Sequence, residues 1–321
     1  MRESSGRPLY RPVMHCLVSQ TFDFLRTMKA IVGPEPTDAI LIAGLGWLTG
    51  ARTTFPQPDE TEDQAEQLLA IRRPEPVDSL AFHVGLPEAV AARRLSELEA
   101  RGMVLRSGGG YLAAPALLRG PAMERIHREV FVEVAAFLED LAALGVQLPM
   151  DHVAAHETRR RVVRLYMRHF LDSGIPEFLR RLGWEPRKAV IFVGVCDANY
   201  DALRASSDLT QALMHGSGVL PDDLRRPVSR TALARRLELP REATTKIVDE
   251  LLAEGWLEAR GRGGLIAPAD VLTGEQVGAI ALRGWEATVA FVQALHQVGM
   301  PMPRSVRARR SSGVHTIPSL L

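Results

Sequence analysis

Cysteine is almost absent from this chain of 321 residues, which contains only Cys16 and Cys196. Two cysteines so far apart make neither a disulfide framework nor a zinc signature. We expect both to be buried structural residues, because a redox sensor needs an accessible, electropositive setting that neither sequence context offers. This cysteine usage fits a reducing cytoplasm.

Long apolar runs are also missing. The longest, residues 39–48, is far shorter than the ~20 residues of a membrane-spanning helix. The N-terminal residues lack the basic, apolar and small-residue order of a signal peptide. We therefore expect a cytoplasmic protein without a membrane partner.

The chain has no overall excess of charge, since 39 Lys and Arg residues balance 38 Asp and Glu residues for a net charge of +1. Any nucleic-acid surface must therefore be local. Residues 1–150 contain 15 basic and 19 acidic side chains, a net −4, and residues 151–321 contain 24 and 19, a net +5. The second half is the better candidate for binding phosphate groups.

Catalytic and metal-binding signatures are missing as well. There is no phosphate-binding glycine loop, nucleophile elbow or zinc motif. Asp197, Asn199 and Asp201 follow an apolar run but lack a partner His or Lys, so we interpret them as a helix cap or loop. His152 and His156 are four residues apart, yet no third ligand is assured. We expect no enzyme activity, no cofactor and no metal.

What is present is a motif at residues 228–268, VSRTALARRLELPREATTKIVDELLAEGWLEARGRGGLIAP. Ser229 or Thr231 can cap a first helix. Pro240 ends that helix, because proline cannot continue it and restricts the residue before it. The apolar stripe of this first helix consists of Leu233, Ala234 and Leu237.

The rest of the motif predicts a second helix from Arg241, with its apolar face at Ile247, Val248, Leu251 and Leu252. Gly255 suits the left-handed cap that ends a helix. Two short strands, 256–260 and 265–267, then flank a glycine-rich turn at residues 261–264.

The same motif occurs earlier, at residues 76–115, at a constant offset of 153 residues without a gap. The glycines at 108–110 take the place of the second turn's glycines. The offset pairs Leu80-Ala81 with Leu233-Ala234, Leu86-Pro87 with Leu239-Pro240, Leu98 with Leu251, Gly102 with Gly255, and Ala114-Pro115 with Ala267-Pro268. We infer a tandem duplication.

The repeat extends to both sides of the motif. Amphipathic patterns predict long helices over residues 124–146 and 276–298, and a helix over residues 16–31. Residues 39–44 match 189–194, although the spacing slips by a few residues there. Residues 38–49 are apolar throughout and predict a buried helix or, less favoured, a buried strand.

The order of helix, tight turn, helix and glycine-tipped hairpin resembles the winged helix-turn-helix of bacterial transcription regulators, the MarR-like kind among them. The resemblance rests on Leu233-Ala234, the Leu239-Pro240 turn, the helix end from Leu251 to Gly255 and the glycine-rich tip. It covers about forty residues in each motif. Some winged helices bind only protein.

The resemblance implies a fold that is mainly α with small β-wings (α+β). Two tandem winged-helix units would pack through long N- and C-terminal helices as a pseudo-dimer within one chain. The expected division is a flexible arm at 1–12, units at 13–150 and 151–303, with winged motifs at about 76–115 and 228–268, and a basic tail at 304–321.

The resemblance also implies a sequence-specific regulator that binds double-stranded DNA. Its recognition helix, residues 241–252, would enter the major groove, with the 260–264 wing on the adjacent backbone or minor groove. Between residues 225 and 262 there are nine basic and six acidic side chains. The candidate contacts in the second motif are Arg230, Arg235, Arg236, Arg241, Thr244, Thr245, Lys246, Arg260 and Arg262.

The first motif offers fewer contacts. Its candidates are Arg93 and Arg94 on the recognition helix and Arg106 on the wing. Glu88 at the leading edge would repel phosphate, and Ala91 and Ala92 offer a base only a methyl group. Either this motif binds a weaker half-site, or it retains the fold without contacting DNA.

Three alternatives stay open. In the first, the chain is a protein-interaction module associated with the chromosome or polymerase, without DNA specificity of its own. A small-molecule effector binds between core and motifs, with Trp47, Phe55, Trp184 and Tyr200 as walls, although a core role for these aromatics is favoured. The long helices pair with a second chain as well as within one chain.

Overall fold

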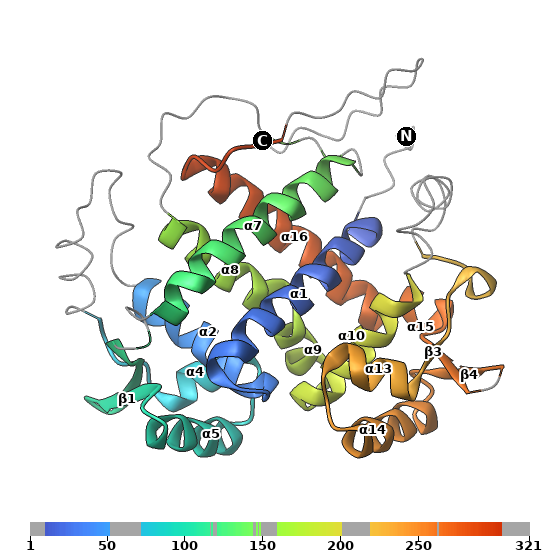
Figure 1. The fold of residues 1–321 in the computed structure, drawn as a ribbon, viewed down its shortest axis with the longest axis horizontal. Helices are drawn as coiled ribbons and strands as arrows, with labels where there is room; N and C mark the ends of the chain where they lie inside the picture. The colour runs from blue at the N-terminus through green and yellow to red at the C-terminus, as the bar shows by residue number, and fades with distance from the viewer. Residues whose placement is uncertain are drawn as a thin grey trace.

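The computed structural model describes residues 10–51, 72–115, 117, 121–143, 146, 148, 159–200, 219–261 and 263–303. These residues are mainly helical and contain two small antiparallel sheets, so the fold belongs to the α+β class. Figure 1 shows long helices crossing one another, with two smaller units of short helices and a hairpin along one edge.

The first half of the chain starts with two helices, continues through a small unit and ends with a long helix. We call the small unit the first head. In order, the elements are α1 (Tyr10–Val32), α2 (Pro36–Ala51), α4 (Val77–Val84), α5 (Glu88–Ala100), β1 (Val104–Ser107), β2 (Gly110–Ala113) and α7 (Pro121–Ala143), of which α4 to β2 form the first head.

The second half follows the same order and contains the second head, residues 228–266. In order, the elements are α8 (Arg159–Ser173), α9 (Ile175–Leu182), α10 (Pro186–Asn199), the 3-10 turn η1 (Asp222–Leu224), β3 (Val228–Ser229), α13 (Arg230–Leu237), α14 (Arg241–Ala253), β4 (Glu258–Arg260), β5 (Gly264–Ile266), α15 (Ala269–Thr273) and α16 (Glu275–Gln297).

The offset of 153 residues found in the sequence also relates the helices of the two heads. Added to the bounds of α4, it gives 230–237, the bounds of α13, and added to those of α5 it gives 241–253, the bounds of α14. The two helices of each head therefore lie at equivalent positions of the sequence and have equal lengths.

The turn between the two helices of each head needs a left-handed backbone. Gly85 adopts φ 73° in the first head, and Glu238, at the equivalent position, adopts φ 51° in the second. Glu238 is the one residue other than glycine with positive φ among those described. Lys29 of α1 holds it there, with Nζ 2.5 Å from the Glu238 carboxylate.

Each hairpin gains a backbone pairing that the sequence did not predict, a third strand in the second head and an isolated bridge in the first. Val228 pairs with Leu265, so β3 joins the hairpin of the second head and gives the strand order β3-β5-β4. In the first head Glu75, at the position equivalent to Val228, forms a bridge with Tyr111. The chain entering each head is therefore tied to its hairpin by backbone hydrogen bonds.

One helix in each half supports its head through a glycine. A Cβ on Gly44 of α2 would lie 2.7 Å from the Val84 side chain, and a Cβ on Gly194 of α10 would lie 3.0 Å from Leu237. A Cβ at Gly44 would clash and one at Gly194 would crowd its neighbour, so the glycines let the helices approach closely. The apolar residues 38–49 lie within α2, so the favoured prediction of a buried helix is correct and the strand alternative is wrong.

The four long helices α1, α7, α8 and α16 form the core that joins the halves. α1 packs against α7 of its own half and α16 of the other, and α8 packs against α16 and α7 in the same way. Amphipathic stripes explain these contacts, because each helix has an apolar face that only a neighbouring helix can cover. Phe24, Tyr166 and Phe291 meet where the helices cross.

Polar side chains also cross between the halves. The Tyr166 hydroxyl donates to the Gln20 carbonyl at 2.9 Å and lies 3.1 Å from the Glu133 carboxylate. The Thr27 hydroxyl donates to the same carboxylate at 2.9 Å. This network joins α1, α7 and α8, and burial raises the pKa of Glu133.

Several predicted boundaries differ from the structure. Helix α1 begins at Tyr10, so the predicted arm at 1–12 is too long, and within that arm residues 1–9 lie outside the description. Asp197 and Asn199 are in the last turn of α10 and not in a loop, while Asp201 lies outside the described residues. The strand predicted from residue 256 begins at Glu258.

No helix in the described part of the chain combines the length and the apolar character that crossing a bilayer requires.

His169 of α8 is buried at the centre of the core. Its ring is parallel to that of Phe291 within 4°, with centroids 4.4 Å apart, and lies 5.9 Å from Phe137 of α7. Burial lowers the pKa of His169 to about 3. The imidazole therefore stays neutral in the folded protein at pH values where an exposed histidine is protonated.

We expect His169 to make the folded state sensitive to acid. Below its ordinary pKa of 6.5, the unfolded chain binds a proton at His169 that the folded chain excludes, so stability falls as the pH drops toward 3. The substitution His169→Phe keeps an aromatic ring against Phe291 and removes this titration. Between pH 6.5 and 4, the free energy of unfolding should fall less steeply in the variant, by up to about 1.4 kcal/mol per pH unit. Urea unfolding across this range measures both slopes, and equal slopes would contradict the assignment.

Candidate nucleic-acid interface

The second helix of the second head begins at a sharp turn and presents its N-terminal end outward. Ser229 caps the first helix, α13, by accepting a hydrogen bond from the Ala232 N–H at 3.2 Å. After the turn, Pro240 leads directly into Arg241, the first residue of α14. The N-terminus of a helix offers unpaired N–H groups and a positive dipole end, which favour an anion such as phosphate.

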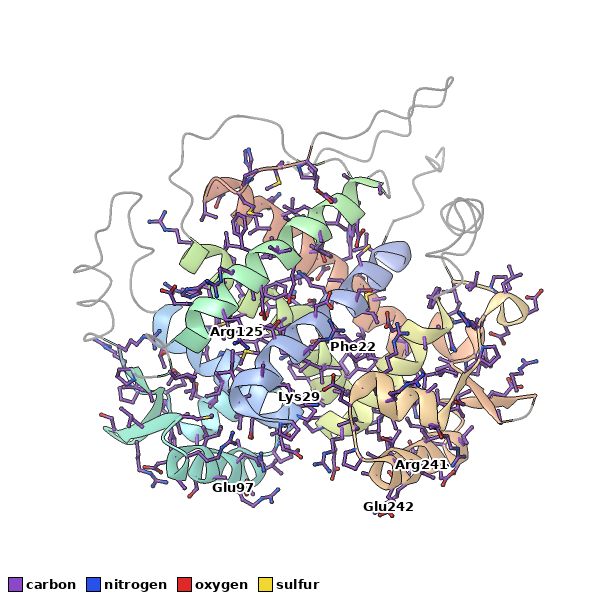
Figure 2. The ribbon with its side chains drawn as sticks, in the orientation of Figure 1. Phe22, Lys29, Glu97, Arg125, Arg241 and Glu242 are labelled. Carbon is purple, nitrogen blue, oxygen red and sulfur yellow. The ribbon has the colours of Figure 1, made fainter. Side chains whose placement is uncertain are left out.

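Three basic side chains of this head are exposed without an ion-pair partner in the described part of the chain. They are Arg235 on α13, and Arg241 and Lys246 on α14. Figure 2 shows Arg241 at the outer edge of the head, next to the exposed Glu242. These cations are available for an external anion, and Glu242 reduces the local positive charge only in part.

Two further arginines are exposed in part and paired with carboxylates. Arg230 lies 2.6 Å from Asp249, and Arg260 of β4 lies 2.9 Å from Glu258 and 3.7 Å from Asp222. Such surface pairs are weak. A phosphate could replace the carboxylate at either arginine, so both remain candidates. Arg262, at the hairpin tip, lies outside the described residues.

Arg236 has a different role from the predicted one. Its Nε donates to the Asp197 carboxylate at 3.1 Å, and Asp197 is buried in the last turn of α10. This ion pair connects α13 to its supporting helix. Arg236 therefore positions the head, and we do not retain it as a contact residue.

The two threonines of α14 differ in exposure. Thr244, predicted to contact a base, is fully buried, and its hydroxyl donates to the Pro240 carbonyl at 3.0 Å. It belongs to the buried stripe with Val248 and Leu251, because these positions recur at helical spacing. Thr244 is thus excluded from the exposed surface, whereas Thr245 is half-buried and retained.

The first head presents a different surface. Arg94 points inward, where its Nε donates to the buried Asp38 at 2.9 Å, and Ala91 is fully buried, so neither is exposed for contact with DNA. Arg93 is exposed and only 3.8 Å from Glu97. Arg106 lies over the Tyr111 ring at 5.0 Å.

Equivalent positions of the two heads show how far they have diverged. At the offset of 153 residues, Arg241 corresponds to Glu88, Thr245 to Ala92, Lys246 to Arg93, Arg230 to Val77, and Arg235 to Phe82. Phe82 is 77% exposed, a feature that the sequence analysis missed because periodicity alone did not place it outside the core.

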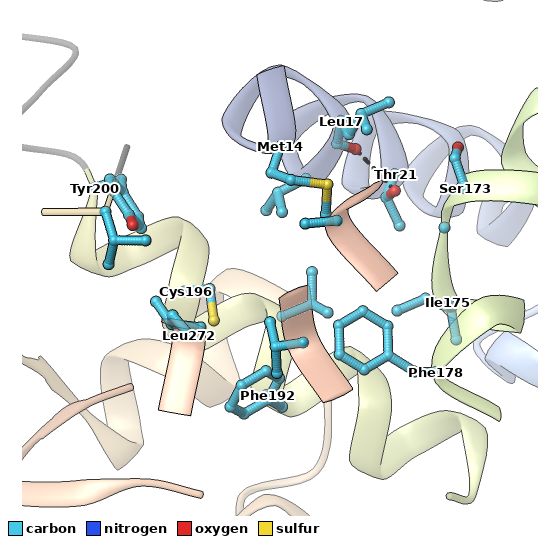
Figure 3. A pocket seen from close by; sticks show the side chains of 16 residues that line it. Met14, Leu17, Thr21, Ser173, Ile175, Phe178, Phe192, Cys196, Tyr200 and Leu272 are labelled. Carbon is cyan, nitrogen blue, oxygen red and sulfur yellow. Dashed lines mark hydrogen bonds between the residues drawn. The ribbon is translucent and has the colours of Figure 1, made fainter. Parts of the chain in front are cut away.

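An apolar cavity of about 80 Å³ lies between α1 of the first half and α9, α10 and α16 of the second. One water needs only about 10–15 Å³ by such a measure, so the cavity is several waters in size. Figure 3 shows the side chains that line it, among them Met14, Leu17, Phe178, Phe192, Cys196 and Tyr200.

The chemistry of this cavity suits an apolar occupant. The Thr21 hydroxyl on its wall already donates to the Leu17 carbonyl at 2.8 Å. Burial raises the pKa of the Cys196 thiol to about 12, so Cys196 is a protonated, buried residue, as expected, and not a thiolate. Cys16 is half-buried. The first half has Gly46 at the position equivalent to Cys196, and Met167 of α8 packs against it.

Of the three described aromatic residues among the predicted cavity walls, Tyr200 lines this one and the two tryptophans do not. Trp184 packs against Trp256 in the support of the second head, with centroids 4.7 Å apart. Trp47 lies under the Arg168 guanidinium at 5.1 Å. Phe55 lies outside the described residues.

The described residues contain no group of three or more His, Cys, Asp or Glu side chains placed to hold a metal ion. His152, His156 and the basic tail at 304–321 lie outside the description.

Comparisons of the chain with protein-family models, with curated proteins and with solved structures find no match.

Arg235 and Arg236 are adjacent in sequence and differ in environment, which allows a matched test of the assignment. Arg236→Gln removes the charged guanidinium that pairs with the buried Asp197 carboxylate, so the free energy of unfolding should fall by roughly 1–3 kcal/mol. Arg235→Gln should change it by less than about 0.5 kcal/mol, because its side chain is exposed. Thermal or urea unfolding of both variants measures the difference. A similar loss in both would contradict the positioning role of Arg236.

Proposed function

We propose that this chain is a sequence-specific DNA-binding transcription regulator and not an enzyme. In this proposal the heads are winged helix-turn-helix domains of the MarR-like kind, and the two halves form a pseudo-dimer within one chain. It acts in the bacterial cytoplasm on the nucleoid. Helix α14 enters the major groove of double-stranded DNA, and the β4–β5 hairpin lies on the neighbouring backbone or minor groove.

The observation that carries the proposal is the difference in charge between equivalent positions of the duplicated heads. Arg235, Arg241 and Lys246 of the second head are exposed and lack an ion-pair partner in the described residues. The first head has Phe82, Glu88 and Arg93 at the equivalent positions. A fold needs no exposed cations at these positions, since the first head folds without two of them. Their presence in the second head is therefore best explained by an anionic partner.

The arrangement of the two heads suits one duplex. Figure 1 shows α5 and α14 along the same edge of the molecule, so both second helices can face a single DNA surface. Arg93 is an exposed cation that the first head contributes on α5. With unlike surfaces on its two heads, the chain would prefer an asymmetric site in which α14 provides most of the specificity.

The alternative for the first head is binding to protein. The observation that favours it is Phe82, which is 77% exposed on α4 where the second head has Arg235. A large exposed aromatic side chain is typical of protein interfaces, in which such residues anchor the contact. In this alternative only the second head contacts DNA, or neither does. The other partner that we retain is a second copy of the chain, which would form a homodimer through the long helices.

An apolar effector is a further part of the proposal. The cavity touches α1 of one half and α10 of the other, and α10 supports α13 of the second head. A molecule filling it would contact both halves next to the helix that supports the second head. It would shift the position of that head only if its affinity differs between two arrangements of the halves.

The DNA proposal is tested with sheared DNA from the source organism, retained on the purified protein at moderate salt and sequenced. A recurring motif is then used to measure affinity against salt concentration. Arg241→Ala with Lys246→Ala should weaken binding at least tenfold, because base and phosphate contacts are lost. The slope of log K against log salt should become shallower by up to about 1.8, which corresponds to two phosphate contacts.

Arg93→Ala is the matched control, because it removes the cation equivalent to Lys246 from the first head. It should weaken binding less than the double variant. Unchanged affinity in the double variant would exclude α14 as the recognition helix. Failure to enrich any sequence would favour the protein-interaction alternative.

The effector cavity is tested with indole as an apolar probe. Ala281 is 5% exposed and lines the cavity, so Ala281→Leu should fill part of it and raise the thermal midpoint. Indole should stabilise the original protein against heat and have no effect on the variant. If indole raises both midpoints equally, it binds elsewhere and the cavity is not its site.

A further inference from the structure

The turn of each head lies at the end of a helix that belongs to the opposite half. Helix α1 ends just before Gly33 and α9 just before Gly183, and both glycines have positive φ, 99° and 63°. The next helices begin at Pro36 and at Pro186, 150 residues later. The ends of α1 and α9 are therefore equivalent places of the duplication, and their contacts with the heads can be compared.

In the first head this contact is closed. A Cβ on Gly85, in the turn between α4 and α5, would lie 2.8 Å from Cγ of Arg180 and 2.9 Å from the Pro176 carbonyl oxygen, both on α9. Arg180 also donates to the His83 carbonyl at 2.7 Å. The turn therefore rests directly on α9, and only glycine fits at its centre without a shift.

In the second head a groove separates the turn from α1. Glu238 stands at the position of Gly85, and the Lys29 Nζ atom lies 2.5 Å from its carboxylate and 3.4 Å from its carbonyl oxygen. The groove runs between α1 and residues 236–239 and has a volume of about 60 Å³. One water needs roughly 10–15 Å³ by such a measure, so several waters fit.

The floor of this groove is apolar and comes from both halves of the molecule. Figure 2 shows Phe22 and Lys29 on α1, with Lys29 at the end of the helix nearer to the heads. The apolar side chains of the lining are Phe22, Leu25 and Ala39 from the first half and Val190, Leu237 and Leu239 from the second. Such a surface suits the apolar body of a small molecule.

Two cations stand beside this floor on one face of α1. Arg26 and Lys29 both line the groove and are three residues apart, the spacing of neighbours on a helix. Arg26 lies 2.8 Å from Asp23, and its side chain is 66% exposed, while Glu238, the partner of Lys29, is 58% exposed. Exposed ion pairs are weak, so the carboxylate of a ligand can replace either acidic partner.

The remaining charged groups of the lining are bound more firmly to other residues. Glu35 forms an ion pair with Arg187, and Arg236 forms one with the buried Asp197. The charges that a ligand meets are therefore the two cations of α1 and the replaceable Glu238. A cationic ligand would lie beside both cations, whereas an anionic ligand is attracted by them.

We propose that this groove binds a small organic acid, with its carboxylate on Arg26 and Lys29 and its apolar body on the floor. The site is separate from the apolar cavity, because the two share no lining residue in the described part of the chain. The bound carboxylate displaces Glu238 from Lys29 and so releases the contact between α1 and the turn of the second head. Binding of the acid does not depend on the proposed function, and its test contains no DNA.

The test titrates benzoate into the full chain at pH 7 and low salt by calorimetry. Benzamide keeps the ring and lacks the charge, and acetate keeps the charge and lacks the ring. We expect saturable binding of benzoate with a dissociation constant at least tenfold lower than that of either control compound, because each control loses one of the two contacts. Absence of benzoate binding, or equal affinity for benzoate and benzamide, would overturn the proposal.

Three variants locate the bound benzoate. Lys29→Gln should weaken binding at least tenfold, because a charged donor is lost. Lys188→Gln is the matched control, since Lys188 forms a similar pair with Glu254 at 2.6 Å and is not among the described residues that line the groove. It should leave the affinity unchanged. Glu238→Gln keeps the size of the side chain and removes the competing charge, so it should strengthen binding several-fold. Equal affinities in all three variants would show that benzoate binds elsewhere and would overturn the assignment.

Discussion

The packing of the two halves against each other is the constraint on which the rest of the structure depends. Each of the four long helices has an apolar face and packs against a long helix of the other half. α1 therefore contacts α16, and α8 contacts α7, across the halves. The hydrogen bonds of Tyr166 and Glu133 make this apolar contact specific, because they form in only one register of the helices.

The packing of this core determines the positions of the two heads. Glycines 44 and 194 let the supporting helices α2 and α10 approach the heads closely. Lys29 of the first half holds the turn of the second head through Glu238, and Arg180 of the second half donates to the His83 carbonyl of the first head at 2.7 Å. A change in how the halves pack would therefore move both heads, which is the physical basis for linking the cavity to the α14 surface.

The duplicated heads share a fold and differ in which arginines their cores use. In the first head Arg94 is bound to the buried Asp38, and in the second head Arg236 is bound to the buried Asp197. These ion pairs fix each head to its supporting helix and engage both guanidinium groups within the protein. Arg241 and Lys246 have no such partner among the described residues and remain available. The cations that support a DNA-binding role are those that the fold does not require.

The sequence by itself determined the duplication, the helices of both heads and the turns between them, because periodicity and the positions of proline and glycine are local signals. Only the tertiary structure decided which side chains are exposed. Thr244, Arg94 and Arg236 have suitable chemistry for DNA contact, yet Thr244 is buried and the two arginines bind carboxylates 56 and 39 residues away in sequence. Such ion pairs, the third strand of the second sheet and the cavity between α1 and α10 depend on contacts between distant segments. Helical spacing carries no information about them.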